Sequence, residues 1–166
     1  DLNHFLTDEE ILELACDYSK DKVINCCKGF HKSYISIVKE IKSIKPDYIV
    51  VPIGSGETFV GLYQGIRKYK LKTILVGIGV KNTTYSFADK LFATKYRPYE
   101  DDIKNIISEC HKLFLLSEIE VRNCYHKFKK IVNCEPSAAV VMSIFDLIKF
   151  NKDDKIILIN TGKGLI

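Results

Sequence analysis

Continuous apolar runs alternate along the chain with stretches in which apolar residues recur at helical spacing. Residues 48–53 read Tyr-Ile-Val-Val-Pro-Ile, the pattern expected of a strand that is buried on both faces of a sheet. Shorter apolar runs predict further strands at 22–25, 73–78, 113–116 and 155–159.

Helices are predicted between these strands. Thr7-Asp8-Glu9-Glu10 is a capping box that starts a helix continuing to about residue 20. Further helices are predicted at about 33–44, from the glycine-containing loop at 54–58 to about 69, and at 85–93, 117–130 and 136–150; part of 94–112 is also expected to be helical. Strands that alternate with helices predict one α/β domain over residues 1–166, with an open, mostly parallel sheet and helices on both faces.

The composition narrows the function classes. Hydrophobic residues make up 46% and charged residues 28%, and the net charge of +4 comes from lysines spread along the chain, so we expect no nucleic-acid partner. No apolar run is long enough to span a bilayer, so no membrane role is expected. The six cysteines match no zinc-binding spacing and are expected to be buried or idle thiols of a cytoplasmic protein, with reactivity of the adjacent Cys26-Cys27 pair as the alternative.

The strongest functional signal is the loop Gly54-Ser55-Gly56-Glu57-Thr58, which joins the buried strand to a helix. Open α/β sheets bind ligands beyond the carboxyl ends of their strands, and a helix start offers free N–H groups to an anion. The loop therefore predicts a phosphate cradle, with a tight turn that binds nothing as the alternative. It lacks the lysine of a P-loop and the third glycine of the dinucleotide fingerprint.

Residues 47–58, followed by Gly61 and Gly65, resemble the phosphate-loop segment of the pyridoxal-phosphate enzymes of the tryptophan synthase β-subunit superfamily, which includes threonine synthase, threonine dehydratase and cysteine synthase. The shared features are an apolar strand, a Val-Pro pair, a Gly-Ser-Gly loop and a glycine-rich helix. Glu57 departs from the glycine that many members have. A carboxylate there would repel phosphate unless its side chain points away.

Two later segments resemble the same superfamily in order and spacing. Residues 133–139 resemble its Glu-Pro-Ser helix start, and residues 158–165 resemble its closing strand and turn in the Thr-Gly-x-Gly-Leu form of threonine synthases. The resemblance implies that Gly54, Ser55, Gly56, Glu57 and Thr58 bind the cofactor phosphate, and that Glu135, Thr161 and Gly162 lie near the ring. Glu135 could instead favour a helix N-terminus, and Thr161 could cap its own turn.

The resemblance implies that the Thr161 hydroxyl faces the pyridine nitrogen of pyridoxal phosphate. A neutral hydroxyl does not keep that nitrogen protonated, so elimination and replacement at the β- or γ-carbon of an amino acid are favoured. The implied enzyme is threonine synthase-like, with a threonine dehydratase or cysteine synthase-like enzyme as the alternative, and it is expected to be a homodimer.

The Schiff-base lysine of the superfamily has no counterpart here, and the superfamily gives Lys81 and Lys90 no such role. The chain begins at Asp1 and stops after a glycine-rich turn, so we expect both ends to be cut edges and the chain alone to be inactive. Two other hypotheses remain: a non-catalytic binding module or pseudoenzyme with the same fold, and a nucleotide-binding α/β domain.

Overall fold

Four parallel strands form one open sheet in the computed structural model, which describes residues 29–81, 85–91 and 98–162. The strands are β1 (Tyr48–Pro52), β2 (Ile74–Val80), β3 (Lys112–Leu116) and β4 (Ile156–Leu158), in the spatial order β3-β2-β1-β4. Val50 of β1 lies opposite Val76 of β2 and Leu158 of β4. This confirms the predicted α/β fold; the capping box at 7–10 and the strand at 22–25 lie outside the described residues.

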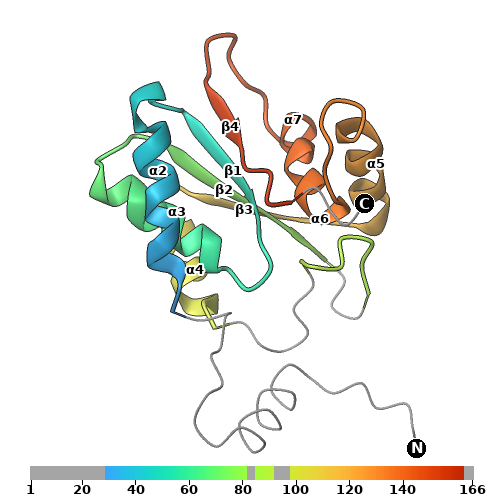
Figure 1. Cartoon of the computed structure of the whole chain (residues 1–166), viewed down its shortest axis with the longest axis horizontal. Helices are drawn as coiled ribbons and strands as arrows, with labels where there is room; N and C mark the ends of the chain where they lie inside the picture. Colours follow the sequence, from blue (N-terminus) through green and yellow to red (C-terminus); the bar gives the residue numbers. More distant parts are fainter. Residues whose placement is uncertain (1–28, 82–84, 92–97, 163–166) are drawn as a thin grey trace, which may run out of the picture.

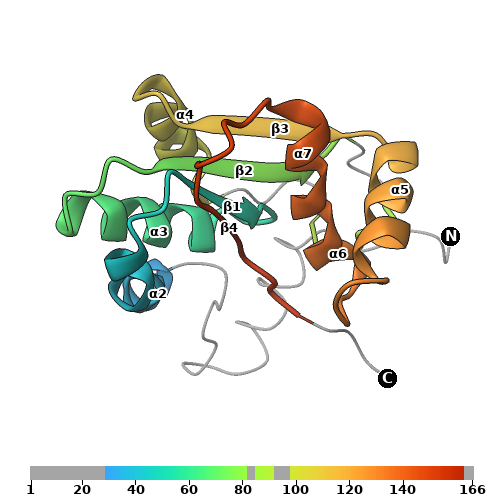
Figure 2. The same cartoon turned by 90° about the horizontal axis from the view of Figure 1, so that it is seen from above.

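Helices cover both faces of this sheet (Figures 1 and 2). One layer contains α2 (Ile35–Ile41) with its flanking 3-10 helices η1 (His31–Tyr34) and η2 (Lys42–Ile44), α3 (Glu57–Lys68) and α4 (Glu100–Ser108). The other contains α5 (Glu118–Phe128), α6 (Pro136–Ala139), the 3-10 helix η3 (Val140–Ser143) and α7 (Ile144–Leu147). Among the described residues, no helix is long and apolar enough to cross a bilayer.

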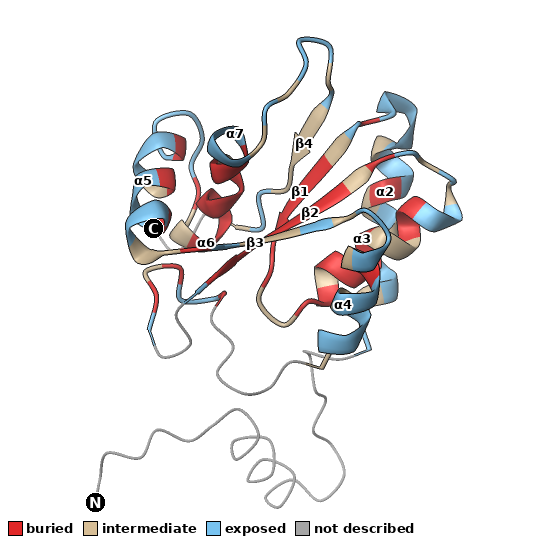
Figure 3. Cartoon of the chain, turned by 180° about the vertical axis from the view of Figure 1, so that it is seen from behind, coloured by how far each residue is buried: buried red, intermediate tan, exposed pale blue. Residues whose placement is uncertain are grey.

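The alternation of side chains along β1 divides the core between the two layers. Ile49 and Val51 pack with α2, α3 and α4, whereas Val50 packs with α5, α6 and η3. All three side chains are completely buried, as expected for a central parallel strand covered on both faces (Figure 3). Burial on both faces of the sheet explains why the apolar run in the sequence is continuous.

The predicted helix at 85–93 is wrong over its described part, because residues 85–91 form turns. Their backbone N–H groups bond to side chains in place of helical carbonyls. The N–H of Phe87 donates to Glu118, that of Ala88 to the Ser86 hydroxyl, and that of Lys90 to the Ser137 hydroxyl. Local apolar spacing could not reveal the acceptors on Glu118 and Ser137, which are remote in the sequence.

Other boundaries differ less. The predicted helix at 136–150 is divided into α6, η3 and α7 and ends at Leu147, and β2 continues to Val80. The stretch 94–112 contains α4, as partly expected. The predicted helices at 33–44 and 117–130 are confirmed, the second beginning with a capping box in which Ser117 and Glu120 satisfy each other's backbone.

Two glycines let the helices of the first layer approach closely. A Cβ on Gly61 of α3 would lie 2.1 Å from the carbonyl oxygen of His31, and one on Gly65 would lie 2.6 Å from Val38 Cγ2. The glycine-rich character of this helix is therefore explained by its contact with η1 and α2.

Candidate functional site

The glycine loop lies just beyond the carboxyl end of β1, between the end of the strand and the start of α3. Gly54 contacts a distant segment there, since a Cβ on it would lie 2.8 Å from the backbone oxygen of Lys90. Gly56 is the N-cap of α3 and has a φ of 96°, in the left-handed region that favours glycine. A Cβ on Gly56 would also lie 2.6 Å from Ile103 Cδ1. Glycine at both positions therefore lets the loop pack against the Lys90 backbone and against Ile103 of α4.

A cavity of about 300 Å³ opens beside this loop, at the carboxyl edge of the sheet. It brings together the loop, the turn at 90–91, the start of α6 and the segment after β4. Its lining residues are Pro52, Gly54, Ser55, Thr58, Lys90, Leu91, Glu135, Ser137 and Thr161. The three segments on which the sequence resemblance rests therefore meet at one polar cavity.

Gly56 and Glu57 do not line this cavity, although Ser55 and Thr58 on either side of them do. The Glu57 side chain points to other partners. Its carboxylate is buried and accepts hydrogen bonds from the Phe30 N–H at 2.5 Å and from the Tyr99 hydroxyl at 3.2 Å. The Tyr99 hydroxyl in turn accepts from the Gly29 N–H at 2.7 Å and lies 3.0 Å from His31 Nδ1. Burial is the main reason that the pKa of Tyr99 is raised.

Glu57 therefore ties the segment before η1 to the start of α3. Because its negative charge is bonded to two donors outside the cavity, the Glu57 carboxylate does not argue against phosphate binding by this loop. Of the predicted cofactor contacts in this loop, the Glu57 side chain is the one that the structure assigns to a different set of partners.

Glu135 precedes α6 as its N-cap residue, but its side chain makes no capping hydrogen bond. Its carboxylate instead forms an ion pair with the Lys90 ammonium. Gly162 packs directly against the same carboxylate, since a Cβ on Gly162 would lie 2.9 Å from Glu135 Oε1. The backbone joins them as well, through a 3.1 Å hydrogen bond from the Glu135 N–H to the Gly162 oxygen.

Thr161 lines the cavity beside this pair. The turn that follows β4 is capped by Asn160, whose Oδ1 accepts the Gly162 N–H at 3.2 Å. Capping of this turn therefore does not depend on Thr161, which is an exposed residue. Lys163 and the residues after it lie outside the described residues.

Sequence reasoning missed four residues that line this cavity, the apolar Pro52 and Leu91 and the polar Lys90 and Ser137. Ser137 is almost completely buried and holds the Lys90 N–H at 3.1 Å, and its place in the Glu-Pro-Ser segment was the available signal. Lys90 had no local signal, because its position depends on contacts with segments remote in the sequence.

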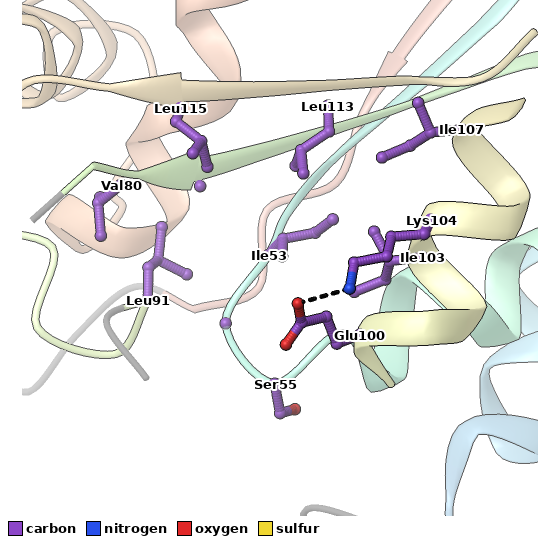
Figure 4. Close-up of a pocket in the computed structure, with 12 residues that line it drawn as sticks. Ile53, Ser55, Val80, Leu91, Glu100, Ile103, Lys104, Ile107, Leu113 and Leu115 are labelled. Carbon is purple, nitrogen blue, oxygen red and sulfur yellow. Dashed lines mark ion pairs between the residues drawn. The ribbon is translucent and has the colours of Figure 1, made fainter. Parts of the chain in front are cut away.

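A second cavity, of about 170 Å³, lies on the other side of the same loop and shares Gly54, Ser55 and Leu91 with the first. Figure 4 shows that its walls are mainly aliphatic side chains, from Ile53 just after β1 and from β2, β3 and α4, and that the Glu100–Lys104 ion pair lies at its side. An aliphatic wall offers few donors to an anion, so the polar cavity is the better candidate for binding phosphate.

No protein-family model matches the sequence, and no curated protein matches it. Solved structures do. The processed form of threonine deaminase isoform 2 from Solanum lycopersicum is 14% identical with a TM-score of 0.70, and the match covers 92% of this chain and 52% of the deaminase. Maize serine racemase is 14% identical with a TM-score of 0.67, covering 97% of this chain and 59% of the racemase.

A pyridoxal 5'-phosphate-dependent aspartate racemase is also 14% identical, with a TM-score of 0.66 and coverage of 92% and 55%. The chain shares the fold of these enzymes. It spans little more than half of the length of each of these three, so the fold is shared with one part of each enzyme. At this level of identity the likeness establishes the α/β architecture and leaves the activity to be argued from the site.

Proposed function

We propose that this chain is the cofactor-phosphate-binding part of a pyridoxal-phosphate-dependent enzyme that acts on amino acids. The observation that carries the proposal is the polar cavity at the carboxyl edge of β1, where the glycine loop, Glu135 and Thr161 meet. The shared fold supports it, since one of the similar structures is a pyridoxal 5'-phosphate-dependent racemase.

The residues present fit a phosphate group. Ser55 and Thr58 offer hydroxyl donors at the cavity, and the first N–H groups of the 12-residue helix α3 have no acceptor within the helix. The buried Glu57 carboxylate, which would oppose an anion, has its own donors in Phe30 and Tyr99. Gly54, Ser55, Gly56 and Thr58 would hold the phosphate, while Glu57 would shape the loop.

On the wall formed by the start of α6 and the segment after β4, Thr161 would contact the ring nitrogen, with Gly162 and Glu135 beside it. When bound, the cofactor supplies an electron-accepting ring. A hydroxyl partner donates one hydrogen bond to the nitrogen and does not keep it protonated, which favours β- or γ-elimination and replacement. The Thr161-Gly162 ending favours a threonine synthase-like reaction; the threonine deaminases with the same fold give a dehydratase reaction about equal weight.

The group that forms a covalent bond with the cofactor is expected outside this chain, so the chain alone should bind the cofactor without turning substrate over. The whole enzyme is proposed to be a cytoplasmic homodimer with a small amino-acid substrate, as the sequence resemblance implies.

Thermal unfolding of the chain with pyridoxal phosphate, pyridoxal or ATP tests the proposal. A ligand that binds only the folded state raises the midpoint, and at 100-fold excess over its Kd it adds about 2.7 kcal/mol. We expect pyridoxal phosphate to raise the midpoint more than pyridoxal does, and Ser55→Ala to reduce the difference. Ser108→Ala, on an exposed turn of α4, is the matched control.

Stabilisation by ATP with none by pyridoxal phosphate would overturn the proposal in favour of a nucleotide-binding domain. A full-length protein that binds pyridoxal phosphate but acts on no amino acid would favour the non-catalytic binding module.

A further inference from the structure

Lys90 occupies a junction between the segments that form the polar cavity. Its backbone oxygen lies against Gly54 of the glycine loop, and its N–H donates to the hydroxyl of Ser137 at the start of α6. Its ammonium pairs with Glu135, which packs against Gly162. Three separate contacts therefore fix the backbone and the side chain of one lysine at this cavity.

The distribution of charge around the cavity distinguishes Lys90 from the other residues that line it. Among the described residues that line it, Lys90 is the one lysine or arginine, and Glu135 is the one acidic residue. The Glu135 side chain is 11% exposed and that of Lys90 is 60% exposed. A nearly buried carboxylate thus holds a solvent-accessible ammonium at the cavity wall.

A dianion that enters the cavity would be bound more tightly if a positive charge added to the hydroxyl and backbone donors of the loop. Without Lys90, such a ligand would share the cavity with the unpaired carboxylate of Glu135, and two negative groups at short range repel strongly in a partly desolvated site. The Lys90 ammonium offsets Glu135 and still has donors left, because an ammonium can make three hydrogen bonds.

We infer that Lys90 is an anion-binding residue of this cavity, which contacts the phosphate of a phosphorylated ligand and neutralises Glu135. The inference rests on the proposed function for the identity of that ligand, but the site chemistry requires only a phosphate monoester or free phosphate.

A covalent role for Lys90 is less compatible with its surroundings. The hydrogen bond to Glu135 is the main reason that the pKa of Lys90 is raised above its ordinary value. The ammonium is therefore retained at neutral pH, and an ammonium has no lone pair with which to attack an aldehyde. The same pairing that makes Lys90 a good cation makes it a poor nucleophile.

Calorimetric titration with pyridoxine 5'-phosphate, pyridoxine and inorganic phosphate tests the inference. None of these has an aldehyde, so none can react with lysines. We expect Lys90→Met to weaken pyridoxine 5'-phosphate and inorganic phosphate binding about fivefold, to leave pyridoxine binding unchanged, and to be largely rescued by Lys90→Arg. Lys72→Met, which alters an exposed lysine before the amino end of β2, should bind all three ligands as the unaltered chain does.

Equal affinity of Lys90→Met and the unaltered chain for pyridoxine 5'-phosphate would overturn the inference and leave the proposed function standing. An equal loss for pyridoxine would also overturn it, since Lys90 would then act on something other than phosphate. Lys90-dependent binding of inorganic phosphate without binding of pyridoxine 5'-phosphate would support the inference and contradict the proposed function. If Lys90→Met fails to fold, Lys90→Gln gives the same comparison.

Discussion

Gly54 has no side chain at the point where the loop meets the backbone of Lys90. In Gly54→Ala the new Cβ would lie 2.8 Å from a backbone oxygen, which cannot rotate away as a side chain could. We expect the free energy of unfolding to fall by about 1–3 kcal/mol, and phosphate binding to weaken because the Lys90 segment is displaced. Urea unfolding and phosphate titration measure the two effects. Unchanged stability would show that this contact is not close in solution.

The buried Glu57 carboxylate has two donors outside the cavity, the Phe30 N–H and the Tyr99 hydroxyl. In Glu57→Ala, the Phe30 N–H and the Tyr99 hydroxyl lose their shared acceptor, which should cost about 1–3 kcal/mol. Tyr99→Phe removes one of the two donors to Glu57 and also the acceptor of the Gly29 N–H, so it should destabilise the fold as well. In a double-mutant cycle read by urea unfolding, we expect the two changes to be non-additive; strict additivity would contradict the network.

Gly54 and Glu57 could be predicted from the sequence as residues of the glycine loop, but their partners could not. The loop at 54–58 was recognisable because strand, glycines and helix follow one another directly. That Glu57 faces Tyr99, and that Lys90 faces Glu135, depends on contacts between residues more than 40 positions apart. No local pattern encodes such pairs.

The contact between η1 and α3 depends on glycine at position 61. In Gly61→Ala the Cβ would lie 2.1 Å from the carbonyl oxygen of His31. Alanine favours a helix by about 1 kcal/mol over glycine, so the overpacking must exceed this gain to destabilise the fold. We expect a net loss of about 1–2 kcal/mol in urea unfolding. Glu40→Ala on the exposed face of α2 is the control, and equal effects of both would contradict the close approach.

His111, immediately before β3, joins this edge strand to β2, because its Nδ1 accepts the Leu75 N–H at 2.9 Å. Burial is the main cause that lowers the pKa of His111 from 6.5, and the nearby Glu109 opposes it. The folded state therefore binds a proton less readily than the unfolded state does. The stabilising contribution is present above the unfolded pKa and is lost as pH falls through the folded pKa.

We therefore expect the free energy of unfolding to decrease as pH falls from about 7.5 to about 5. Urea unfolding across this range measures the slope, and His111→Gln should flatten it. A variant that retained the full slope would assign the pH dependence to other groups.

At the scale of elements, the sequence predicted well wherever packing and periodicity agree. The central strand, β2, β3 and α5 follow their apolar patterns, and Ser117 and Glu120 formed the capping box at the predicted helix start. The prediction was wrong at 85–91, where the spacing suits a helix but the N–H groups of Phe87 and Lys90 donate to Glu118 and Ser137. Tertiary hydrogen bonds outweighed local propensity there.

At the scale of the whole molecule, the cavity exists because the sheet is open and both helical layers reach its carboxyl edge. The α3 layer supplies the glycine loop, and the α6 layer supplies Glu135 and Ser137. A ligand that contacts both layers should therefore stabilise the fold as a whole. Buried thiols in the α6 layer can report this effect.

Cys124 and Cys134 are buried in that layer, whereas Cys110 is exposed at the end of α4. Burial raises the pKa of Cys124 to about 11, so both access and the thiolate fraction are low. With an alkylating reagent and peptide mass mapping, we expect Cys110 to react quickly and Cys124 only through global unfolding. Pyridoxine 5'-phosphate should slow labelling of Cys124 and leave that of Cys110 unchanged. Equal slowing at both would indicate an effect on the reagent, and no slowing at either would mean that the ligand does not stabilise the two layers together.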